Sequence, residues 1–170
     1  MPYPESLVAP MRAELTRLGV EELRDAAAVD AAFEAAEDHT MLLVINSVCG
    51  CAAANARPAV ALSLQSSVRP DRLTTVFAGQ DLEATAQARQ YLAGIPPSSP
   101  FIALFKEGDP VFVLERRHIE GRSAGAIAMD LVKAYQAFCG EGEGEAPAPP
   151  AEPEASSAES HLPPTFRSIL

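Results

Sequence analysis

The 170-residue sequence is poor in basic side chains and in cysteine, and it has no long apolar run. Its 13 Lys and Arg stand against 23 Asp and Glu, which argues against a nucleic-acid partner because phosphate binding needs clustered positive charge. No stretch approaches the roughly 20 consecutive apolar residues that cross a membrane. The N-terminus lacks a basic segment followed by an apolar run, so we expect no secretory signal and a cytoplasmic protein.

The sequence contains only three cysteines, Cys49, Cys51 and Cys139. Stable disulfides are rare in the cytoplasm, so these thiols are expected to be reactive, metal-binding or simply buried rather than a disulfide framework. Tetrahedral zinc would require one or two ligands beyond a first cysteine pair, and no second pair has ligand spacing. We therefore predict no metal site.

Charge and proline are concentrated at the C-terminal end. Residues 141–170 contain six Glu, one Arg and six Pro without helical or strand periodicity, which predicts an acidic, Pro-rich, disordered tail. The whole chain is 48% apolar, enough for a core. We therefore expect one domain over residues 1–140 and a separate tail over residues 141–170.

Apolar spacing predicts alternating helices and strands in the first 140 residues. Residues 41–45 are continuously apolar, which is typical of a central strand covered on both faces. Pro58 is expected to kink its helix, Gly108-Asp109-Pro110 to form a hairpin turn, and residues 20–23 are ambiguous. The order predicts an α/β fold with a mixed sheet flanked by helices. Helices are expected from about residue 5 to Gly19 and over residues 26–36, 52–61, 82–92 and 124–138, and further strands over residues 74–78, 101–105 and 111–114.

Cys49-Gly50-Cys51 lies where the buried strand ends and a helix begins. The free N–H groups and the positive end of the dipole in a first helical turn favour thiolate over thiol, which makes a cysteine a nucleophile near neutral pH. Cys51 is placed to attack a mixed disulfide formed at Cys49, and Gly50 gives the connecting backbone the freedom that such a tight ring needs. Two other interpretations compete with this one: the two cysteines are simply small buried residues, or they are metal ligands.

The segment Asn46-Ser47-Val48-Cys49-Gly50-Cys51-Ala52, with Arg57-Pro58 downstream, resembles the bacilliredoxin family. These bacterial proteins have a thioredoxin fold and a Cys-Gly-Cys in place of Cys-x-x-Cys. The resemblance covers residues 3–139 and leaves the tail outside the family pattern. It continues through Val8-Ala9-Pro10-Met11-Arg12, Val76-Phe77-Ala78-Gly79-Gln80-Asp81, Pro97-Ser98-Ser99-Pro100 and Arg117-His118-Ile119-Glu120-Gly121.

The resemblance implies a thioredoxin-like three-layer sandwich and the removal of bacillithiol, a low-molecular-weight thiol, from oxidised proteins. Cys49 would attack the mixed disulfide and Cys51 would resolve it. Pro100, an ordinary trans loop proline by base rate, would be cis and face the cysteines, with Ser99 offering backbone groups to the substrate. No cofactor would be bound. Bacillithiol or another small thiol would be the co-substrate, S-thiolated proteins the partners, and a reductase would recycle the enzyme.

Two other functions remain open at this stage: a protein disulfide isomerase or reductase, and a non-catalytic redox-sensing module whose tail recruits a partner. Asn46 and Ser47 could bond the thiolate or the substrate, or satisfy backbone groups at the strand end. For Arg57 we favour a structural ion pair over contact with a substrate carboxylate. We interpret Cys139 as a packing residue on a helix face and His118 as a surface residue.

Overall fold

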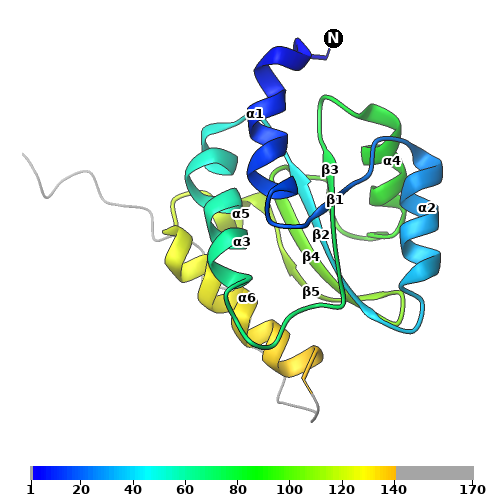
Figure 1. The fold of residues 1–170 in the computed structure, drawn as a ribbon, viewed down its shortest axis with the longest axis vertical. Helices are drawn as coiled ribbons and strands as arrows, with labels where there is room; N and C mark the ends of the chain where they lie inside the picture. The colour runs from blue at the N-terminus through cyan, green and yellow to red at the C-terminus, as the bar shows by residue number, and fades with distance from the viewer. Residues whose placement is uncertain (1, 141–170) are drawn as a thin grey trace, which may run out of the picture.

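A five-stranded mixed sheet runs through the centre of residues 2–140, the part of the chain that the computed structural model describes (Figure 1). The spatial order is β1-β3-β2-β4-β5. β1, β3 and β2 are parallel to one another, whereas β4 is antiparallel to β2 and β5 is antiparallel to β4. The strands are β1 (Glu21–Glu22), β2 (Thr40–Asn46), β3 (Arg72–Phe77), β4 (Phe101–Lys106) and β5 (Asp109–Leu114).

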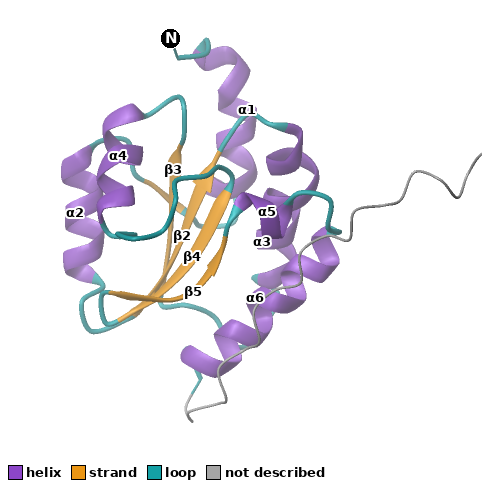
Figure 2. Cartoon of the chain, turned by 180° about the vertical axis from the view of Figure 1, so that it is seen from behind, coloured by secondary structure: helices purple, strands orange, loops and turns teal. Residues whose placement is uncertain are grey.

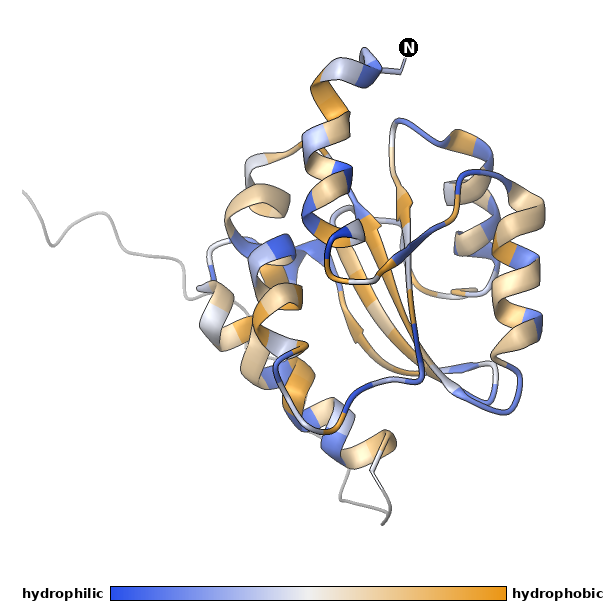
Figure 3. Ribbon diagram, in the orientation of Figure 1, coloured by the Kyte–Doolittle hydropathy of each residue, from blue (hydrophilic) through white to orange (hydrophobic). Residues whose placement is uncertain are grey.

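Helices cover both faces of the sheet and complete the expected thioredoxin-like three-layer sandwich (Figure 2). All seven positions of β2 are buried, which explains why its residues 41–45 are continuously apolar. The apolar strands lie between the two helical layers (Figure 3). One layer contains α1 (Glu5–Thr16), the π-helix η1 (Ala52–Ala56), α3 (Arg57–Ser63), α5 (Arg116–Ile119) and α6 (Ala124–Phe138); the other contains α2 (Ala26–Ala35) and α4 (Leu82–Gln90).

Two short features differ from the sequence prediction. The ambiguous residues 20–23 contain β1, whose two residues pair with Thr74 and Thr75 of β3. The predicted turn at Gly108-Asp109-Pro110 is wrong by one position, because the turn residues are Glu107 and Gly108, with φ of 53° and 84°. Positive φ at both central residues matches the twist of paired strands. Pro110 therefore lies within β5, an edge strand that tolerates a missing N–H.

The helix after the cysteines begins with a widened turn, as the predicted kink at Pro58 requires. In η1 the Arg57 N–H donates to the carbonyl of Ala52, five residues back. Pro58 has no N–H to donate, and its ring would clash with the carbonyl four residues earlier in a regular α-helix. The π-turn removes this conflict and keeps the helical path continuous into α3.

Helix α1 is fastened to the end of the sheet at which β2 and β3 finish. Arg12 is only 6% exposed and bonds Asp81, just beyond β3, at 2.5 and 3.1 Å. The same guanidinium reaches Glu22 of β1 at 3.0 Å. This buried pairing fixes α1 beside β1 and the segment that follows β3.

No helix within residues 2–140 has the length and apolar character needed to cross a bilayer. The predicted tail, residues 141–170, lies outside the described residues.

Candidate active site

Cys49 begins the helix that follows β2, as the sequence predicts. Its carbonyl accepts the N–H groups of Ala52 and Ala53 at 3.1 and 3.2 Å. Its Sγ also accepts the Ala52 N–H, at 3.4 Å. The sulfur therefore occupies the position in which free amides and the helix dipole favour negative charge.

The Cys49 sulfur has further polar neighbours. Burial opposes its ionisation, but hydrogen bonds from Cys51, Ser47 and Ala52, with the positive charge of Arg116, outweigh burial and lower the pKa of Cys49. The Ser47 hydroxyl donates to Cys49 Sγ at 3.2 Å. Cys49 thus has the environment of a nucleophilic thiolate.

Cys51 has the opposite tendency. Burial, its hydrogen bond to Cys49 and the charge on Cys49 raise the pKa of Cys51 to about 11. Both thiols are reduced and half-buried. Ionisation is therefore favoured at Cys49 relative to Cys51, which donates a hydrogen bond to it.

Arg57 bonds the residues that precede Cys49, and the predicted structural ion pair of Arg57 is confirmed. Its side chain is 2% exposed, and Nε donates to Glu14 Oε2 of α1 at 2.7 Å. Its Nη1 donates to Asn46 Oδ1 and to the Ser47 carbonyl, both at 3.0 Å. Because Arg57 is buried among these partners, it holds the loop.

Asn46 lies inside the protein at 2% exposure. Its Oδ1 also accepts the Ser47 N–H at 2.9 Å, and Nδ2 donates to the carbonyl of Met11 at 3.4 Å. Of the two roles left open by the sequence, the contacts of Asn46 match the satisfaction of groups at the strand end. Ser47, in contrast, touches both the loop backbone and the Cys49 sulfur.

The Ser99–Pro100 peptide bond is cis, as the family resemblance implies. Pro100 is buried and immediately precedes Phe101, which pairs with Ile45 near the end of β2. The cis-proline loop therefore lies beside the strand end from which the Cys49 loop departs.

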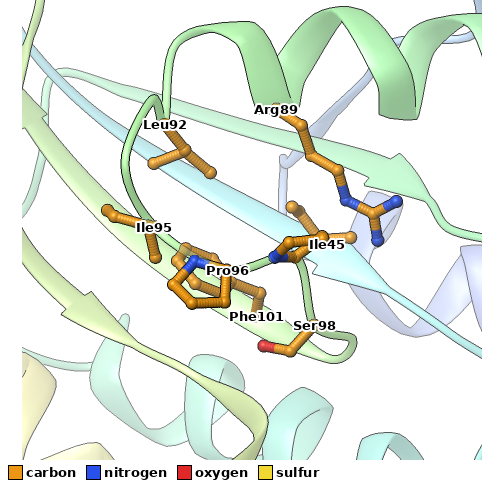
Figure 4. A pocket seen from close by; sticks show the side chains of 8 residues that line it. Ile45, Arg89, Leu92, Ile95, Pro96, Ser98 and Phe101 are labelled. Atoms are coloured by element: carbon orange, nitrogen blue, oxygen red, sulfur yellow. The ribbon is translucent and has the colours of Figure 1, made fainter.

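A small cavity lies under the loop that leads to Pro100 (Figure 4). It encloses about 10 Å³, room for about one water molecule. Arg89 of α4 lines it together with Ile45 and Ser98, and within residues 2–140 its buried Nε has no hydrogen-bond partner. A cavity of this size is too small to accommodate a thiol substrate.

The sequence missed the segment after β5 as part of the site. The Arg116 N–H donates to Ser98 Oγ at 3.2 Å, which joins α5 to the cis-proline loop. The charge of Arg116 lowers the pKa of Cys49, and the charge of Glu120 helps to raise that of Cys51. Only the return of the chain after β5 brings these residues to the cysteines, so the motif over residues 117–121 did not by itself indicate a place in the site.

The prediction that His118 is a surface residue is wrong, because it is 8% exposed. Its Nδ1 accepts the Glu115 N–H at 3.1 Å, and the Glu115 side chain accepts the His118 N–H. This reciprocal capping fixes the first turn of α5.

Cys139 ends α6 and packs against the core, which confirms its interpretation as a packing residue. Burial raises the pKa of the Cys139 thiol despite a hydrogen bond with Thr40. Thr40 is the first residue of β2 and Asn46 the last, so about 20 Å of strand separates Cys139 from the Cys49 loop. Within residues 2–140, no three His, Cys, Asp or Glu side chains gather as a metal site would require.

Known proteins resemble this chain over its whole described length. A family model described as disulphide isomerase matches residues 3–139. A bacilliredoxin of Salinibacter ruber is 65% identical over 170 residues, covering 99% of both chains. A bacilliredoxin of Koribacter versatilis is 49% identical over 138 residues, covering 81% of this chain and 94% of the relative. One of Halalkalibacterium halodurans is 50% identical over 137 residues, covering 81% of this chain and 94% of the relative.

A reduced thioredoxin of Schistosoma mansoni has 17% identity and a TM-score of 0.47, covering 68% of this chain and 97% of that one. The family model ends at residue 139, consistent with a tail outside the general pattern. The Salinibacter ruber match continues through that tail, so the extension is shared with this relative.

Proposed function

Because this chain belongs to the bacilliredoxin family and is a thiol–disulfide oxidoreductase, we propose that it removes bacillithiol, or a similar small thiol, from protein mixed disulfides. The observation that carries the proposal is the pairing of Cys49 with Cys51 at the start of the helix. There the pKa of Cys49 is lowered and the pKa of Cys51 is raised to about 11. The Cys49 sulfur is thereby favoured as the attacking thiolate, and the Cys51 thiol is favoured to stay protonated until it resolves the mixed disulfide.

In the first step the Cys49 thiolate attacks the small-thiol sulfur of the mixed disulfide. The substrate disulfide breaks, a disulfide forms between Cys49 and the small thiol, and the substrate protein leaves as a thiolate that takes up a proton. The hydrogen bonds from Ser47 and Ala52 favour the thiolate form of Cys49 that makes this attack.

In the second step the Cys51 thiolate attacks Cys49 Sγ and the small thiol departs as a thiolate. Two causes of the raised pKa of Cys51 are its hydrogen bond to Cys49 and the charge on Cys49, and both vanish once Cys49 is in a disulfide. The mixed disulfide thus promotes ionisation of the thiol that resolves it. The Cys49–Cys51 disulfide is then reduced by a second small thiol or by a reductase, with no bound cofactor.

The proposed substrate-contacting groups lie on two loops. Ser99 and Pro100 would offer backbone groups to the incoming disulfide. Ser47 would donate a hydrogen bond to the reacting sulfur of Cys49. Asn46 would not contact the substrate but would hold Ser47 in position. We place this cycle in the cytoplasm, where small thiols and reductases keep disulfides reduced.

The proposal is tested by incubating a Cys51→Ala variant with a carrier protein that bears one bacillithiol mixed disulfide. We expect one small thiol attached to Cys49 by mass spectrometry, whereas the unmodified chain ends with the Cys49–Cys51 disulfide. A Cys51→Ala/Cys139→Ala double variant is the matched control and should keep the adduct. An adduct on Cys139 alone, or none, would overturn the proposal.

Disulfide isomerisation is the second candidate, favoured by the description of the matching family model. Recovery of scrambled ribonuclease measures it directly. Isomerase activity requires recovery by the unmodified chain and its loss in Cys49→Ser. If the unmodified chain recovers no ribonuclease activity while it still removes bacillithiol, this candidate is excluded.

A further inference from the structure

The segment of residues 115–122 forms a third side of the site and touches both other loops. At its start, the Arg116 N–H donates to Ser98 Oγ, two residues before Pro100. At its end, the Arg122 carbonyl accepts from Asn55 Nδ2 in η1, four residues after Cys51. These two contacts hold α5 against the cis-proline loop and the cysteine helix together.

Arg116 presents a cation from this segment. Its side chain is 45% exposed, and Nε bonds Glu120 Oε2 at 3.3 Å. Within residues 2–140 its two terminal nitrogens have no hydrogen-bond partner. The electrostatic influence of Arg116 extends to both Cys49 and Cys51. Arg116 therefore presents a partly exposed guanidinium on the α5 side of the site, within electrostatic reach of both sulfurs.

We infer that Arg116 binds a carboxylate of the small thiol carried by the mixed-disulfide substrate. This inference rests on the proposed function, in which that thiol passes to Cys49. Many low-molecular-weight thiols carry a carboxylate, and a guanidinium fork matches a carboxylate in geometry and charge. A small thiol joined to Cys49 would be held within electrostatic reach of Arg116, and the bond from Nε to Glu120 leaves both terminal nitrogens available for a carboxylate.

A positive charge here has two separable effects. Stabilisation of the Cys49 thiolate accelerates attack on every disulfide equally. Recognition of a carboxylate accelerates only the reactions of thiols that carry one. The ratio of kcat/KM between two adducts that differ only in a carboxylate therefore isolates recognition.

Two adducts on the same carrier protein, N-acetylcysteine and N-acetylcysteamine, differ by this one group. With the unmodified chain we expect faster release of N-acetylcysteine, and Arg116→Gln should lower the ratio about 5-fold. Added salt should lower the ratio for the unmodified chain, because it screens an exposed pair. Arg117→Gln, the neighbouring exposed arginine, is the matched control and should leave the ratio unchanged.

Glu120→Gln provides a second variant that removes the competing carboxylate and should raise the ratio. If Arg116→Gln slows both adducts equally and the ratio stays constant, Arg116 acts only on the thiolate and the inference is overturned. A failure of the unmodified chain to release either adduct would instead overturn the proposed function, and the inference with it.

Discussion

Arg57 Nη1 lies 3.0 Å from Asn46 Oδ1, and this bond joins the first turn of α3 to the last residue of β2. The same nitrogen holds the Ser47 carbonyl, while Nε reaches Glu14 of α1. Three elements therefore meet at one buried guanidinium directly behind the Cys49 loop. The hydroxyl that bonds the Cys49 sulfur belongs to Ser47, so the position of this hydroxyl depends on Arg57.

Arg57→Met is expected to lower the free energy of unfolding by about 1–3 kcal/mol, because it removes the donor from buried acceptors at Asn46 and Ser47. Urea unfolding followed by circular dichroism measures this. Glu14→Gln is the matched control: it alters only the half-exposed end of the network and should cost less than about 1 kcal/mol. Equal losses in the two variants would mean that the bonds to Asn46 and Ser47 contribute nothing beyond the ion pair.

Ser47→Ala should raise the pKa of Cys49, since the variant lacks one of the hydrogen bonds that favour the thiolate. Alkylation of Cys49 by iodoacetamide rises with pH as the thiol ionises, so the midpoint should move to higher pH. The rate at high pH should be nearly unchanged. Ser67→Ala, at an exposed position without such a contact, serves as the control. A midpoint that stays in place would assign the thiolate's stability to the helix terminus alone.

The local sequence around Cys49 was sufficient to predict that this thiol lies at the start of a helix. A cysteine placed between a buried strand and a helix lies at the helix N-terminus whatever the rest of the chain does. The cis state of the Ser99–Pro100 bond was expected only from the family resemblance. Arg116 was missed because its approach to the cysteines depends on where the chain turns after β5. His118 was misassigned for a related reason: its burial follows from capping a four-residue helix too short to show periodicity.

Cys49→Ala should lower the pKa of Cys51 from about 11, because the hydrogen bond to Cys49 and the charge on Cys49 both disappear. Cys51 is protonated below its pKa and reactive above it, so its alkylation should begin at lower pH in this variant. Mass spectrometry of alkylated peptides, each compared with the unmodified chain at the same pH, measures the shift. An unchanged onset would leave burial, the largest contribution, as the whole cause.

Cys139→Ser should leave thiol exchange unchanged, because Cys139 lies near the start of β2, at the far end of the sheet from Cys49. In the unmodified chain at neutral pH, we expect Cys49 to be alkylated well before Cys139, whose pKa is raised by burial. Competitive labelling at a limiting amount of iodoacetamide compares the two peptides. Preferential labelling of Cys139 would make it a redox thiol in its own right.

Gly108→Ala should lower the free energy of unfolding by about 1–2 kcal/mol, because Gly108 has a φ of 84°, at which a Cβ approaches the neighbouring carbonyl. No heavy atom outside its chain neighbours lies within 4 Å of a Cβ built there, so the cost comes from the backbone alone. Gly125→Ala is equally free of contacts but lies in α6, where alanine should stabilise by about 0.5–1 kcal/mol. The same substitution therefore has opposite signs at the two sites, and urea unfolding resolves them. If both variants lost the same free energy of unfolding, the positive φ of Gly108 would not be the cause of its loss.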